Sequence, residues 1–169
     1  PGQLRARVVR MTLADALAGL GVPQGGVLYV HSSLDWLTTA GIAAGTVLPT
    51  LREWVGAGGT LIMPVYPCRT LHREYLQGHP VYNVRTTPSA VGLISELFRR
   101  TDGVVRSLDP DFCIAALGPE AAVLTATDGG RDPFGPSSVY ARLIARGATL
   151  VGLGVSAISH IGNSFSQNP

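Results

Sequence analysis

The stretch GGVLYVHSSLDWLTTAGIAAGTVLPTLREWVGAGGTLIMPVY, residues 25–66, decides the fold of this 169-residue chain. Two apolar runs, 25–31 and 60–66, stand at its ends next to glycines, as is typical of buried strands. Between them the apolar residues of 47–55 recur at helical spacing, and the glycine-rich cluster 56–59 is typical of a helix end. The stretch therefore predicts a strand, a helix and a second strand, in that order.

Similar segments continue the pattern on both sides. Thr12 is predicted to cap a helix that ends at Gly21, and Thr87 and Pro88 to begin a helix that ends near Arg100. The remaining predicted elements are strands at 112–117 and 148–153, a helix at 119–126 and a helix capped by Ser137 or Ser138. Apolar strands that alternate with amphipathic helices predict an α/β fold: a single domain, 1–169, with a central, largely parallel sheet and helices on both faces.

Composition excludes several classes of protein. The chain is 46% hydrophobic and 14% charged, which suits one buried core. No apolar run approaches the roughly 18 residues of a membrane span, and the first residues lack the apolar core of a signal peptide, so we expect a cytoplasmic protein with no membrane partner. The net charge of +2 comes from scattered arginines, which does not indicate a nucleic-acid partner. Cys68 and Cys113 lack zinc-finger spacing, so we expect reduced thiols and no metal.

Three polar stretches follow the predicted strands, at 31–34, 64–75 and 152–160. In open α/β sheets ligands bind beyond the carboxyl ends of parallel strands, so these stretches are expected to border a binding site. The alternative is that each is only a polar turn that ends a strand, since loops are polar in general.

Seven segments in series carry a more specific signal. They are LGVPQGGVLYVHSSL, GAGGTLIMPVY, TTPSAVGLISELFRR, DGVVRSLDP, AALGPEA, PFGPSSVYARL and LVGLG. In order and spacing these segments, which cover about residues 19–154, resemble the aminoglycoside 3-N-acetyltransferase family. The resemblance implies an α/β fold with a central sheet, acetyl-CoA as cosubstrate, and transfer of the acetyl group to an amine of a small-molecule acceptor.

The resemblance also implies which residues hold CoA. The family's VHSS element lies along the pantetheine and phosphate portion of CoA, and its Arg-Ser pair suits a CoA phosphate because an arginine fork binds phosphate oxygens well. The matching residues here are His31, Ser32, Ser33, Leu34, Arg106 and Ser107. A general-base role for His31 and a surface salt bridge for Arg106 are the alternatives.

The catalytic segment departs from the family's pattern. Acetyl transfer needs a base that takes a proton from the attacking ammonium, and the family uses a histidine in a Thr-x-x-His element followed three residues later by glutamate. Here Ser159 and His160 lie two positions too early, Gly162 occupies the expected position, and no glutamate follows. His160 is thus the candidate base, and an ordinary loop histidine is the alternative.

The acceptor side departs as well. The candidate acceptor-binding residues are Tyr66, Glu74 and Asp109. Asp109 replaces a histidine in the family's Arg-Ser-x-His-Pro, where it could orient a partner, bind a cation or cap a turn. The predicted loop 64–87 carries five basic or histidine side chains against the single Glu74, whereas an aminoglycoside is a polycation. An amino sugar attached to a phosphate, or an amine that bears a carboxylate, therefore fits this loop better than an aminoglycoside.

Two functions follow from these observations. The first is a CoA-dependent N-acetyltransferase acting on an aminoglycoside-like, amino-sugar or natural-product amine. The second is a degenerate or truncated relative, without the family's C-terminal part, that binds CoA or a nucleotide but transfers nothing. The sequence leaves a homo-oligomer open.

Overall fold

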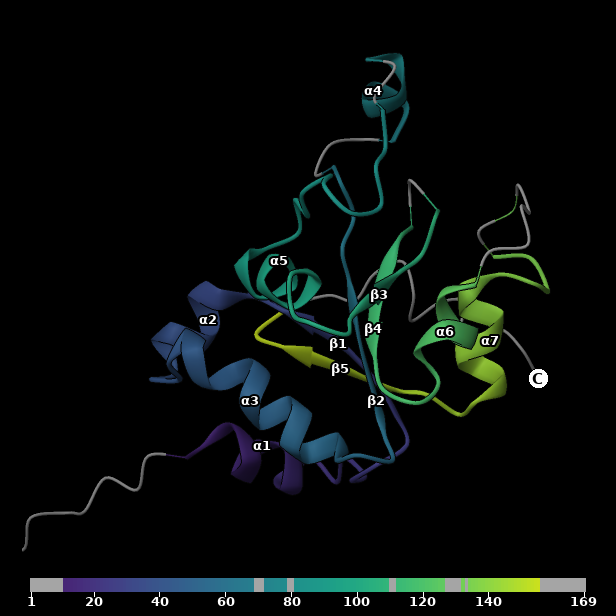
Figure 1. Cartoon of the computed structure of the whole chain (residues 1–169). Helices are drawn as coiled ribbons and strands as arrows, with labels where there is room; N and C mark the ends of the chain where they lie inside the picture. Colours follow the sequence, from purple (N-terminus) through teal and green to yellow (C-terminus); the bar gives the residue numbers. More distant parts are fainter. Residues whose placement is uncertain are drawn as a thin grey trace, which may run out of the picture.

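The two strands predicted within residues 25–66 are present as β1 (Val27–Ser32) and β2 (Thr60–Pro64). They lie side by side within a five-stranded sheet (Figure 1). The computed structural model describes residues 11–68, 72–78, 81–109, 112–126, 132 and 134–155. The other elements in chain order are α1 (Leu13–Gly19), α2 (Leu34–Thr39), α3 (Ala44–Val55), α4 (His72–Gln77), α5 (Leu93–Arg99), β3 (Val105–Arg106), β4 (Ile114–Leu117), α6 (Ala121–Thr125), α7 (Val139–Ala145) and β5 (Thr149–Leu153).

The sheet has the strand order β3-β4-β2-β1-β5 and is mixed. β1 pairs in parallel with both β2 and β5, whereas β4 is antiparallel to β2 and to β3. The prediction of a largely parallel sheet therefore holds for one half of the sheet and is wrong for β4. The short connection 107–113 explains the antiparallel pairing of β4 with β3, because a parallel pair needs a crossover of about a dozen residues or more. β4 lies between β3 and β2 and runs opposite to both.

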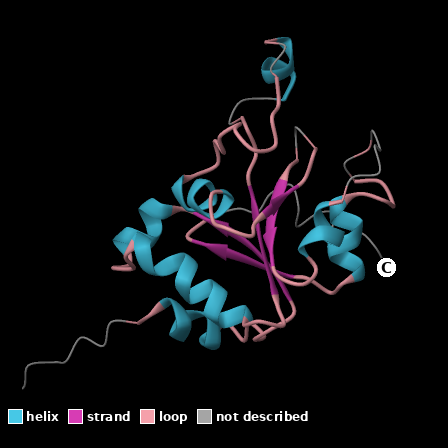
Figure 2. Ribbon diagram, in the orientation of Figure 1, coloured by secondary structure: helices cyan, strands magenta, loops and turns pink. Residues whose placement is uncertain are grey.

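Helices cover both faces of the sheet, as predicted (Figure 2). Successive side chains of a strand point to opposite faces, so Leu28 and Val30 of β1 pack under α1, α2, α3 and α5. Tyr29, between them, packs on the other face with residues of α6 and α7. The strands are buried from both sides, which is why they read as continuous apolar runs in the sequence.

The helix starts follow the sequence in two places. Thr12 caps α1 in a capping box with Asp15, and the Ser138 hydroxyl accepts the Ala141 N–H at the start of α7. The predicted helix start at Thr87 is wrong, because the Thr87 hydroxyl instead accepts the Asn83 N–H within a turn. The helix begins only at Leu93, one turn and more later.

Three short elements were not predicted: α2, α4 and β3. Each has six residues or fewer, which is too short to produce a hydrophobic period that could be recognised. No helix in the described ranges is long and apolar enough to cross a membrane.

Gly118, directly after β4, gives a stability prediction. Its φ of +135° is unfavourable for other residues, and a Cβ there would collide with the Gly59 carbonyl oxygen and lie 2.7 Å from the Thr60 Cα. We expect Gly118→Ala to lower the free energy of unfolding by about 2–4 kcal/mol, measured by chemical denaturation. Gly58→Ala is the matched control, because a Cβ at Gly58 meets no atom within 4 Å; it should change stability by less than about 0.5 kcal/mol. Equal effects of the two would contradict the prediction.

Candidate functional site

The parallel strands β2, β1 and β5 bring two of the three predicted ligand-binding stretches together. The Ser33 N–H, just after β1, donates to the Leu153 carbonyl at the end of β5 over 2.8 Å. Gly154 then packs so closely on α2 that a Cβ there would collide with Trp36. The stretch 31–34 and the start of the stretch 152–160 are therefore neighbours at the carboxyl edge of the sheet, as predicted.

His31 is the next-to-last residue of β1, and one nitrogen of its ring has no partner within the described residues. It pairs in register with Gly152, and its ring meets the Tyr29 ring edge-on, with centroids 4.9 Å apart. The imidazole Nε2 is buried and has no hydrogen-bond partner within the described part of the chain. Burial lowers the pKa of His31 to about 4, so the ring is neutral at neutral pH. A neutral imidazole with a free nitrogen can bond to a ligand, but it is a weak base.

A tight, half-buried turn connects β1 to α2. It consists of Ser32, the last residue of β1, Ser33, and Leu34, the first residue of α2. The Ser33 carbonyl accepts the Leu37 N–H, whereas the Ser33 side chain makes no capping bond in α2. A Cβ on Gly92, which precedes α5, would lie 3.9 Å from the Ser32 carbonyl oxygen. The turn thus lies between β5 and the start of α5.

Three tyrosines form a hydrogen-bonded chain next to this edge. The Tyr66 hydroxyl lies 3.3 Å from the Tyr29 hydroxyl and 2.9 Å from the Tyr140 hydroxyl. Burial raises the pKa of all three phenols, so they are neutral. Phe112 and Phe134 pack on Tyr140 from outside. This tyrosine chain joins β1, the segment after β2 and α7, which are far apart in the sequence, and no local sequence pattern predicts it.

Tyr66 is predicted to bind the acceptor, but its hydroxyl is hydrogen-bonded to the hydroxyls of Tyr29 and Tyr140. Asp109 accepts the Phe112 N–H over 3.0 Å, so of its three predicted roles the structure displays the turn cap. Glu74 lies in α4, which projects away from the sheet beyond its carboxyl edge (Figure 1). Besides burial, the nearby Asp109 carboxylate raises the pKa of Tyr66, so these two candidate acceptor residues lie near each other, whereas Glu74 lies in α4. His160 lies outside the described residues.

Arg106 lies inside the protein, and its alternative interpretation as a surface salt bridge is wrong. Its guanidinium donates to the carbonyl oxygens of Thr87 and Val65 over 2.5 and 2.7 Å. Ser107 is buried as well, and its hydroxyl accepts the Ile114 N–H. Both Nη atoms of Arg106 and the Ser107 hydroxyl thus bond to the protein, and the buried Nε of Arg106 has no partner within the described residues. The predicted contact of Arg106 and Ser107 with a CoA phosphate stays a prediction.

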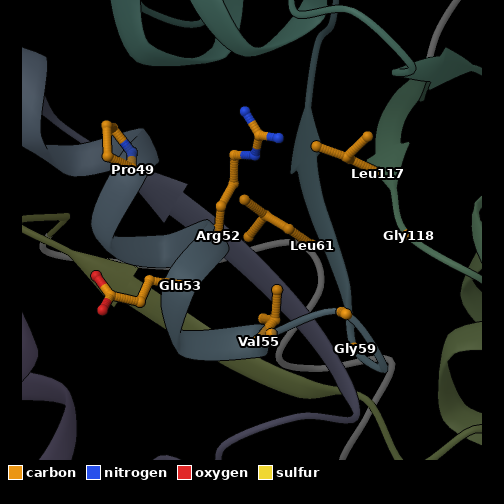
Figure 3. Close-up of a pocket in the computed structure, with 10 residues that line it drawn as sticks. Pro49, Arg52, Glu53, Val55, Gly59, Leu61, Leu117 and Gly118 are labelled. Atoms are coloured by element: carbon orange, nitrogen blue, oxygen red, sulfur yellow. The ribbon is translucent and has the colours of Figure 1, made fainter.

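A cavity of about 500 Å³ lies at the opposite edge of the sheet, by the first residues of β2 (Figure 3). Its walls include Leu61 and Leu117, and Arg52 of α3 extends along it (Figure 3). None of the residues predicted to bind CoA or the acceptor lines this cavity. Neither Cys68 nor Cys113 forms a disulfide within the described residues.

Comparison with known proteins identifies relatives over most of the chain. The family described as aminoglycoside 3-N-acetyltransferase matches residues 29–160. Aminoglycoside N(3)-acetyltransferase VII of Streptomyces paromomycinus is 34% identical over 163 residues, which cover 87% of this chain and 56% of the relative. The chain thus spans about half the length of the curated relatives that it matches.

Solved structures agree with this match. The apoenzyme of aminoglycoside acetyltransferase AAC(3)-IVa superposes with a TM-score of 0.72 at 31% identity, covering 84% of this chain and 52% of that one. The binary complex of AAC-IIIb with CoASH superposes with a TM-score of 0.71 at 28% identity, covering 86% and 59%. The fold described above is therefore shared with these enzymes.

The depressed pKa of His31 predicts how stability depends on pH. The unfolded chain takes up a proton at this histidine near pH 6.5, and the folded chain only near pH 4. The free energy of unfolding should therefore fall as the pH drops from about 6.5 to 4. Above pH 6.5, His31 should add no pH dependence to the stability. His31→Gln should flatten this part of the profile, measured as the difference in unfolding free energy between the two proteins. A ring that titrates near pH 6.5 by NMR would contradict this.

The tyrosine chain predicts an asymmetry between single and double substitutions. Tyr66→Phe removes both bonds and leaves the buried Tyr29 and Tyr140 hydroxyls without Tyr66 as a partner, so unfolding should become easier by about 1–3 kcal/mol. Adding Tyr140→Phe should cost less than the two single losses together, because one stranded hydroxyl is then gone. Strict additivity in a thermodynamic cycle would argue against coupling along the chain.

Proposed function

This chain belongs to the aminoglycoside 3-N-acetyltransferase family, and we propose on that basis that it binds acetyl-CoA and transfers the acetyl group to an amine. The family match over residues 29–160 is the observation that carries the proposal. The single-domain organisation, the cytoplasmic location and any homo-oligomer stay predictions from the sequence.

We place CoA at the carboxyl edge of the parallel strands, along His31 and the turn 32–34. The Nε2 of His31, which has no partner within the described residues, supports this, because a buried polar atom without a partner costs free energy that a ligand group can recover. The Ser33 hydroxyl, which makes no capping bond in α2, is a second group that can reach a ligand. We do not include Arg106 among the CoA contacts, since its fork bonds to backbone carbonyls.

Acetyl transfer needs a general base, and His31, with a pKa of about 4, is too weak a base for that role. The amine nitrogen attacks the thioester carbonyl carbon, the carbon–sulfur bond breaks, and the thiolate leaves and is protonated. The ammonium must first lose a proton to a group whose pKa is nearer the working pH. His31 is too acidic for this, so we keep His160 as the proposed base and His31 as a binding residue.

The acceptor class that we propose is an amino sugar with a phosphate, or an amine with a carboxylate. The basic loop 64–87 supports this choice over an aminoglycoside, because like charges would repel a polycation. The relatives are named for aminoglycosides, and that name is the reason to include one in any test.

The second candidate is a CoA-binding module without transferase activity. It is favoured by the position of Gly162, which stands where the family's pattern has its histidine.

A test with acetyl-CoA separates the two. The purified chain is mixed with acetyl-CoA and with gentamicin, glucosamine or glucosamine 6-phosphate, and released thiol is measured. CoA binding is measured by calorimetry. We expect thiol release, fastest with the phosphorylated sugar, and we expect His160→Ala to lower turnover by about 10²–10⁴-fold with CoA affinity unchanged.

Arg146→Ala, which removes a surface ion pair with Glu120, is the matched control and should leave both values unchanged. Unaltered turnover in His160→Ala would show that the base lies elsewhere. CoA binding without thiol release from any amine would establish the binding module instead.

A further inference from the structure

We infer that Arg106 is a positioning residue that joins the two ends of the segment on the acceptor side of the site. The inference rests on the proposed function. The chain leaves the sheet after β2 at Val65, carries α4, and returns by Thr87, and residues 65–66 and 81–87 are called the neck here. Arg106 is 8% exposed and reaches both sides of the neck.

One guanidinium links the two sides directly. Its Nη1 donates to the Thr87 carbonyl over 2.5 Å, and its Nη2 donates to the Val65 carbonyl over 2.7 Å. These carbonyls belong to residues far apart along the chain, and both are backbone atoms, so the contact is independent of the side chains at those positions. A planar fork with several donors can make both bonds at once, which a lysine ammonium on a flexible stem does less well.

The neck also holds the guanidinium in place. The Tyr82 ring, on the returning side, lies under the Arg106 Cζ with 5.0 Å to the ring centroid. The Tyr82 hydroxyl donates to the Ser107 carbonyl over 2.8 Å. The Cys113 thiol, beneath, donates to the same Val65 carbonyl that Arg106 uses. Burial raises the pKa of Cys113, so the thiol is a neutral donor.

Further bonds continue the closure toward α5. The Ala90 N–H donates to the Tyr66 carbonyl over 2.8 Å, and Glu96 accepts the Ser89 N–H over 2.7 Å. Arg99, which pairs with Glu96, donates to the Arg85 carbonyl over 2.8 Å. Arg99 of α5 and Arg106 of β3 thus both donate to backbone carbonyls on the returning side of the neck.

This arrangement has a consequence for the acceptor. Arg85, one of the basic side chains that support the proposed acceptor class, lies on the returning side of the neck, so its position depends on the closure. The proposed CoA turn 32–34 is instead held by β1, β5 and α2. Loss of Arg106 should therefore disturb acceptor binding and leave CoA binding intact. A CoA-phosphate role for Arg106 requires the opposite result.

The test compares Arg106→Ala and Arg106→Lys with the unmodified chain. Hydrogen exchange by mass spectrometry should accelerate at least tenfold in peptides from 81–92 in Arg106→Ala, and less in Arg106→Lys, with β1 and β2 unaffected. The CoA dissociation constant should change less than twofold, and the acceptor KM should rise at least fivefold with a smaller change in kcat. Arg146→Ala, far from the neck, is the control and should show none of these changes.

Tyr82→Leu and Tyr82→Phe cover the case in which Arg106→Ala fails to fold. The leucine variant removes the ring under the guanidinium and should loosen 81–92, and the phenylalanine variant, which keeps the ring, should loosen it less. Unchanged exchange in 81–92, or a tenfold weaker CoA affinity, would overturn the inference. If the unmodified chain transfers no acetyl group and binds no acceptor, the proposed function fails together with the acceptor role, and the exchange data still decide whether Arg106 closes the neck.

Discussion

The parallel pairing of β1 with both β2 and β5 is the constraint on which the rest of the structure depends. Because all three strands end at the same edge, the turn after β1, the neck after β2 and the chain after β5 meet there. The helices that cover the two faces make the strands apolar throughout, so polar chemistry is confined to the residues that follow them. The candidate site is a consequence of strand direction before it is a matter of particular side chains.

That edge gathers polar groups in a partly buried place, and the protein satisfies them by different means. The phenols of Tyr29, Tyr66 and Tyr140 bond to one another, and Arg106 bonds to backbone carbonyls. The buried Nε2 of His31 has no partner within the described residues, and neither has the buried Nε of Arg106. Of these two side chains His31 is the better candidate for contact with a ligand, because the guanidinium of Arg106 is already held by two backbone carbonyls.

The proposed cofactor turn and the proposed acceptor side differ in how closely they follow the family's pattern. The match to the family covers 29–160, and the turn 31–34 retains the family's residues. Asp109 departs from the family's Arg-Ser-x-His-Pro, and the basic side chains of 64–87 do not suit a polycation; both belong to the proposed acceptor side. Fold and cofactor therefore constrain the acceptor only weakly, since specificity depends on loops that the sheet tolerates in many forms.

Local order was predictable from the sequence, because caps, glycine breaks and hydrophobic periods act over a few residues. Thr12, Ser138 and the helix at 44–55 show this. The resemblance to the family could also be recognised, because each segment that carries it is contiguous in the sequence. Only the tertiary structure decided the direction of β4, the true start of α5, and whether Arg106 faces a ligand or the protein. Those outcomes depend on how strands pair, on a side-chain bond within a turn, and on backbone partners 19 and 41 residues from Arg106, and none of these leaves a periodic trace in the sequence.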